Sequence, residues 1–138
     1  RYSARSILRR VFALTSTAYK FLEIGIAAGP MSQVEIVIGD TRGNRIILPH
    51  ATWTAFIEKR MDIVRLMRSS TLLSLMILDL VIELVKICDL DNVKLSLCDK
   101  CVYMKPSTIL FMLELEQCVE HVYFDLCQYT NIASDKFD

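Results

Sequence analysis

Hydrophobic and polar positions follow the same order twice along this chain. Residues 34–39 and 45–48, separated by a polar turn, are followed by a run with helical spacing. Residues 93–97 and 102–104 are also followed by such a run, 57 to 60 positions further on. Alternation at every second position predicts strands, and apolar residues at 3.6-residue spacing predict a helix. We therefore expect a tandem β-β-β-α pattern, repeated in element order with low sequence identity.

The first repeat contains the clearest local signals. Residues 20–27 predict a strand that ends at the breaker Ala-Gly-Pro of 28–30. The turn at 40–44 contains Gly and Asn, which tolerate positive φ, and predicts a hairpin. A helix is expected over 51–67, whereas residues 9–16 fit either a strand or a short helix.

In the second repeat, β-branched residues favour a strand from about 79 to 87. Turns are expected at 90–92 and 99–100, followed by a long helix over 107–128. The polar residues 129–138 are expected to form a loose tail.

The whole chain, 1–138, is expected to form a single α+β domain. We expect two pseudo-symmetric antiparallel sheets of three or four strands, in repeats over about 9–68 and 71–128. Each sheet is followed by a helix, and the two helices pack together.

Composition supports a folded protein. Of 138 residues, 53% are apolar, which excludes disorder for most of the chain. The longest apolar stretch, 71–88, is interrupted by Asp79, Glu83 and Lys86. A spanning helix needs about 20 nearly uncharged residues, so we interpret this stretch as core and expect no membrane association.

The net charge of zero conceals two unlike halves. Residues 1–68 hold eleven Lys/Arg and five Asp/Glu, giving +6, and residues 69–138 hold five and eleven, giving −6. Such asymmetry indicates a partner surface on the basic half or self-association of unlike halves, unless the charge is merely unevenly spread.

The five cysteines all lie in the second half. Their odd number fits reduced thiols in an intracellular protein better than a disulfide framework. The spacing Cys98-x-x-Cys101 followed by Cys118-x-x-His121 could form a tetrahedral zinc site. The competing interpretation places these residues in the core. Free cysteine is often buried, and apolar residues of the first repeat, Met61 and Val64, match Cys118 and His121. We favour the core and expect no metal and no cofactor.

Catalysis finds little support in the motifs. The chain has four glycines and no phosphate-binding loop, nucleophile elbow or metalloprotease motif. His50, at the start of the first helix, suits a capping or solvent role. We expect a protein that is not an enzyme.

Basic residues of the first half indicate nucleic-acid binding, because phosphate contacts require clustered arginine and lysine. Single strands also need aromatic rings on which bases stack, for which Tyr2, Phe12, Tyr19 and Phe21 are candidates. The expected phosphate contacts are Arg5, Arg9, Arg10, Lys20, Arg42 and Arg45.

The helix over 107–128 is apolar around much of its circumference, so it must be buried against a sheet and a second helix or another subunit. The residues expected in that packing interface are Trp53, Phe56, Phe111, Leu115 and Val122.

Strands followed by a helix, doubled in tandem, resemble the fold of the positive-cofactor transcriptional coactivators and the Whirly proteins. The likeness rests on residues 34–39, 45–49 and 51–67, and on 93–98 and 102–128, and it covers most of the chain. It implies curved antiparallel sheets that bind single-stranded DNA or RNA and helices that form a dimer or pseudo-dimer core. The chain departs from that pattern in having no Lys-rich Whirly-type motif and an acidic second repeat.

The sequence therefore predicts a non-enzymatic nucleic-acid-binding module, with a preference for single-stranded DNA or RNA, in the nucleus rather than the cytoplasm. The alternative is a protein-interaction or dimerisation domain, with a second copy of the chain or another protein as its partner.

Overall fold

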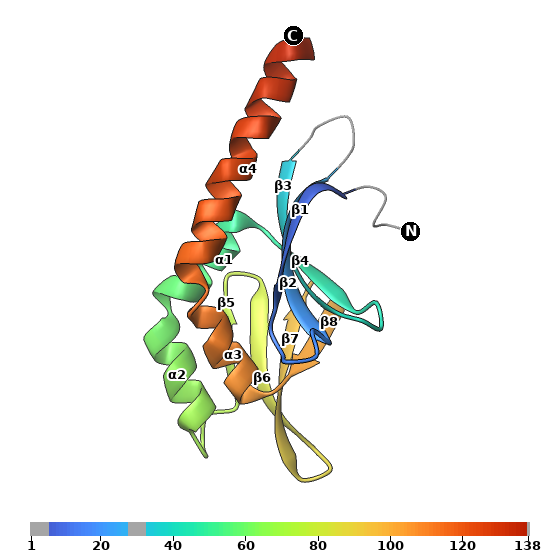
Figure 1. Ribbon diagram of the computed structural model, residues 1–138. Helices are drawn as coiled ribbons and strands as arrows, with labels where there is room; N and C mark the ends of the chain where they lie inside the picture. The colour runs from blue at the N-terminus through green and yellow to red at the C-terminus, as the bar shows by residue number, and fades with distance from the viewer. Residues whose placement is uncertain (1–5, 28–32, 138) are drawn as a thin grey trace.

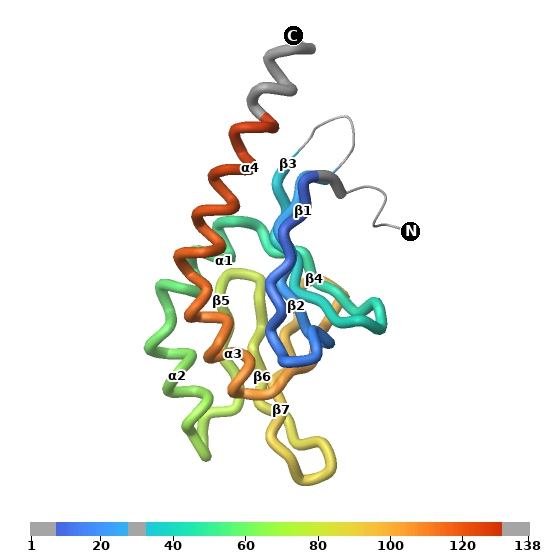
Figure 2. Tube along the Cα trace, viewed as in Figure 1, coloured from blue at the N-terminus to red at the C-terminus, as the bar shows by residue number. Residues whose placement is uncertain are grey.

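The computed structural model describes residues 6–27 and 33–137, with side chains for 8–27 and 33–130. Four strands and two helices follow one another twice (Figures 1 and 2). The first series is β1 (Ser6–Ala13), β2 (Lys20–Ala27), β3 (Gln33–Asp40), β4 (Arg45–Leu48), α1 (His50–Glu58) and α2 (Arg60–Arg68). The second is β5 (Ser74–Ile77), β6 (Leu80–Ile87), β7 (Leu90–Leu97), β8 (Lys100–Met104), α3 (Pro106–Leu113) and α4 (Glu116–Phe137).

The strands form two antiparallel sheets, which we call sheet A (β1-β2-β3-β4) and sheet B (β5-β6-β7-β8). The predicted α+β class with two sheets is confirmed. Each sheet has four strands, because β1 is a strand rather than a helix and a turn divides 71–87 into β5 and β6.

Tight turns in sheet B recur every ten residues. Two-residue turns at 78–79, 88–89 and 98–99 join successive strands, not at 90–92 and 99–100 as expected. Leu78, Cys88, Asp89 and Cys98 adopt positive φ there, at 53°, 53°, 64° and 57°. Since leucine and cysteine rarely adopt this conformation, the sequence gives little warning of these turns.

Each expected helix is a pair of helices with a bend between them. The bends lie at Lys59, with φ −93° and ψ 18°, and at 114–115. Backbone hydrogen bonds continue through the first bend, from Lys59 N–H to Ala55 and from Ile63 N–H to Lys59. No Gly or Pro marks either bend. The helix α4 runs to Phe137, where we expected a loose tail, because nothing in its sequence breaks a helix.

The helices pack against both sheets: α1 contacts β3 and β4 of sheet A, and α3 contacts β7 of sheet B. The helix α4 contacts β2 and β3, whereas α1 and α2 contact β5, and α2 also contacts α3. The strand β4 lies against β7 and β8, so one core joins both sheets. No helix among the described residues is both long and apolar enough to span a membrane.

Candidate functional site

Sheet A has one face in the core and one face turned away from the helices. Leu22 and Ile24 of β2 are fully buried in the core. Because side chains alternate along a strand, Phe21 and Glu23 of the same strand lie on the opposite face. We call this second face the outer face of sheet A.

Two arginines from different strands converge on Glu23 at the outer face. A guanidinium nitrogen of Arg9, in β1, lies 3.5 Å from one carboxylate oxygen, and one of Arg45, in β4, lies 3.7 Å from the other. The Glu23 side chain is 5% exposed, whereas the arginine side chains are 39% and 24% exposed. A shift in the β1–β2 register between Ile7 and Arg10 adds one residue to β1 at this point, and such bulges re-aim side chains.

These three residues border a shallow pocket of about 390 Å³. Its walls also include Phe21 and Val11, and the hairpin between β3 and β4 forms one side. A side chain at Gly39 would come within 3.3 Å of the Phe21 ring, so glycine lets the ring lie close to the neighbouring strand. The pocket thus combines two guanidiniums, one buried carboxylate and an aromatic wall.

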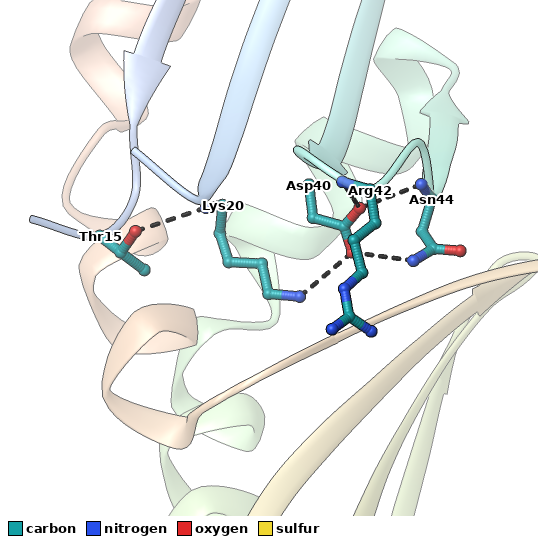
Figure 3. A network of polar contacts seen from close by, with 5 residues as sticks. All are labelled: Thr15, Lys20, Asp40, Arg42 and Asn44. Atoms are coloured by element: carbon teal, nitrogen blue, oxygen red, sulfur yellow. Dashed lines mark hydrogen bonds and ion pairs between the residues drawn. The ribbon is translucent and has the colours of Figure 1, made fainter. Parts of the chain in front are cut away.

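The hairpin beside the pocket is organised by the buried carboxylate of Asp40 (Figure 3). The backbone N–H groups of Arg42 and Asn44 donate to its Oδ1 at 2.9 and 3.0 Å. The Asn44 amide and the Lys20 ammonium donate to Oδ2 at 3.0 and 3.3 Å. Burial by itself raises the pKa of Asp40, but the bonds from Asn44 and Lys20 outweigh it and lower the pKa. The hairpin therefore depends on an ionised carboxylate.

The structure brings together some of the predicted phosphate contacts. Arg9 and Arg45 both line the pocket, and Lys20 lies beside the hairpin. Arg42 is exposed at the hairpin tip, and its guanidinium extends away from the hairpin backbone (Figure 3). Arg10 is exposed but lies opposite the core residue Ile24, on the other face of β1.

Two of the predicted residues, Arg5 and the candidate aromatic Tyr2, lie outside the described part of the chain. Among the other candidate aromatics, Phe21 lines the pocket and Phe12 packs against the core. The Lys20 ammonium lies over the Tyr19 ring, 5.0 Å from the centre of that ring.

The zinc set is not brought together. Cys98 lies in the turn between β7 and β8, and Cys101 is the second residue of β8. Cys118 and His121 are exposed on α4. Within the described residues, no three His, Cys, Asp or Glu side chains converge as metal ligands. The core interpretation is wrong for Cys98 and Cys118, which are exposed.

The residues expected at a helix interface lie in different environments. Trp53 and Phe56 are fully buried and stack at 5.6 Å, so they stabilise this chain's own core and are closed to another subunit. Leu115 and Val122 are partly buried against the same core. Phe111 remains 39% exposed.

A second polar cluster joins the two repeats. His50 Nε2 lies 3.0 Å from a carboxylate oxygen of Glu120 on α4, and its ring stacks on Tyr123 at 4.0 Å. Burial, with Cys127 and Glu120 nearby, raises the pKa of Tyr123. His50 thus has a helix-packing role, instead of the capping or solvent role that its position indicated.

Glu23 and Asp40 were not among the residues that the sequence predicted for the site. Glu23 is two residues from Phe21, so both side chains lie on the same face of the predicted strand. Asp40 begins a turn that ends in Asn44. Those two signals could have identified both residues.

Comparison of the chain with protein-family models, with curated proteins and with solved structures found no match. The function is therefore inferred from the geometry of the site.

Proposed function

We propose that this protein is a non-enzymatic module that binds single-stranded nucleic acid on the outer face of sheet A. The observation that carries the proposal is the pocket in which Arg9 and Arg45 lie beside Phe21. Guanidiniums bind phosphates and base edges, and aromatic rings stack on bases.

The charge around the pocket favours an anionic ligand. The cations are Arg9, Lys20, Arg42 and Arg45, and the anions are Glu23 and Asp40, which gives a net charge of +2. Lys20 is held by Asp40, whereas Arg42 has no ion pair to a residue that the structure describes. Arg42 is therefore suited to contact a phosphate next to the pocket.

Several features favour a single strand over a duplex. Bases stack on protein aromatics only when they are free of their own helix. The outer face also carries exposed apolar side chains, Val11 and Ile47, at 51% and 49% exposure. An unpaired strand can place its bases against these apolar groups. The resemblance of the element order to sheets that bind single strands agrees with this choice.

The test is oligonucleotide binding by the full chain and two charge-reversal variants. We expect Arg42→Glu to weaken binding of a fluorescent single strand about tenfold at 50 mM salt, since each lost phosphate contact changes the salt slope by about 0.7. The matched control is Arg68→Glu, the same change at an exposed position of α2. Equal affinities of Arg42→Glu and the unmodified chain would contradict the proposed surface.

One observation favours the alternative, a protein-interaction or dimerisation domain. Met76 of β5 and its flanking residues Leu73 and Leu78 are 68%, 68% and 58% exposed, and β5 is an edge strand of sheet B. Open strand edges with exposed apolar residues are sites of protein association. Light scattering of the protein alone, run beside the binding titration, distinguishes nucleic-acid binding from dimerisation. A dimer that binds no oligonucleotide would favour the alternative.

A further inference from the structure

Glu23 is an unusual residue to find at the floor of an anion-binding pocket. Its side chain is almost completely buried, yet it lies between two arginines at 3.5 and 3.7 Å. Direct charge-assisted hydrogen bonds between such groups are about 2.7–2.9 Å long. The carboxylate is therefore held mainly by charge and keeps the capacity to accept hydrogen bonds from a ligand in the pocket.

A ligand that reaches this floor must satisfy both kinds of group. A phosphate would pair with the arginines but would be repelled by the carboxylate. A nucleobase edge carries donors and acceptors side by side, so it can face the carboxylate and a guanidinium at once. Phosphates then belong at the rim, near Arg42, and a base belongs in the pocket.

The bases differ in the donors that they offer to two carboxylate oxygens. Guanine has two adjacent donors, N1–H and the N2 amino group, next to the acceptors O6 and N7. Adenine and cytosine offer a single amino group, and thymine and uracil offer a single N–H. Guanine is therefore the base that matches the two oxygens of Glu23 best, with Arg9 or Arg45 donating to O6 or N7.

The size and walls of the pocket fit a single base. A volume of about 390 Å³ accommodates one base but not a long stack. Phe21 offers an aromatic surface on one side, and Val11 offers an apolar one. We infer that this pocket reads guanine in a single strand, with Glu23 accepting hydrogen bonds from the Watson–Crick edge; this inference rests on the function proposed above.

The test compares three twelve-nucleotide thymidine strands with one central guanine, inosine or adenine. Inosine lacks only the N2 amino group of guanine. We expect the unmodified chain to bind the guanine strand about tenfold more tightly than either other strand, as for a bidentate base contact. Equal affinity for guanine and inosine would overturn the inference and leave the proposed function standing. A lack of binding to every strand would overturn both.

Two variants assign the preference to the carboxylate. We expect Glu23→Gln to bind the guanine strand and the inosine strand with equal affinity. Its affinity for an all-thymidine strand should rise, because the pocket loses its buried negative charge; a misfolded variant would bind more weakly. The control is Glu83→Gln on sheet B, at the position that matches Glu23 in the second repeat. A guanine preference that persists in Glu23→Gln would contradict the role of Glu23.

Discussion

Glu23 and Asp40 are buried carboxylates on neighbouring strands of sheet A. Their partners come from other parts of the chain: Arg9 and Arg45 for Glu23, and Lys20 for Asp40. Arginines and lysines can be found in a sequence, but the acids that hold them depend on strand register. This is why the sequence identified the cations of the site and missed the carboxylates.

At the residue scale, Asp40 should make stability depend on pH. Its pKa is lowered in the folded protein, so the stability it adds is fully present above about pH 4, the ordinary aspartate pKa. That contribution is lost as the pH falls through the lower folded-state pKa. We expect Asp40→Asn to reduce the free energy of unfolding by about 1–3 kcal/mol at pH 7.

Urea unfolding at several pH values measures this difference. The difference in free energy of unfolding between Asp40→Asn and the unmodified chain should become smaller as the pH falls below about 4. The control is Asp62→Asn, which removes an exposed ion pair to Arg65 and should change stability by less than about 1 kcal/mol. A gap that stayed constant with pH would contradict the role given to the Asp40 carboxylate.

At the scale of elements, strands were easier to predict than turns and helix ends. The strands 20–27 and 45–48 and the hairpin at 40–44 were confirmed, because alternation and Gly43, with φ of 99°, mark them. The turns of sheet B were displaced by one or two residues, since Leu78 and Cys88 do not signal positive φ. The bends at Lys59 and 114–115 follow from packing against both sheets, which no local pattern records.

The turn at 88–89 allows a direct test of the positive-φ conformation in sheet B. Both of its residues have positive φ, the conformation of a type I′ turn, in which asparagine is favoured. Cys88 is exposed, so its replacement costs no packing. Cys88→Asn should raise the free energy of unfolding by about 1 kcal/mol.

Thermal and urea unfolding would measure that gain. The control is Cys101→Asn, at the second residue of β8 and paired with Ser96, where asparagine is unfavourable and stability should fall. If Cys88→Asn were as destabilising as Cys101→Asn, the turn would not have the conformation described.

At the scale of the whole molecule, the two unlike halves are joined to each other. Arg60 of α2 pairs with Glu116 of α4, and His50 pairs with Glu120. Part of the charge asymmetry is thus used within the protein, which weakens the case for association of neighbouring chains through opposite halves. Around the pocket of sheet A, the Arg9 side chain remains 39% exposed beside Glu23, and Arg42 is exposed at the hairpin tip.

The most direct test of the central claim is a map of the binding surface. The amide signals of a 138-residue chain can be followed by nuclear magnetic resonance while a single-stranded oligonucleotide is added. We expect the largest changes on the outer face of sheet A and its hairpin, at Phe21, Glu23, Gly39, Gly43 and Arg45. Changes confined to sheet B or to α4 would contradict that claim.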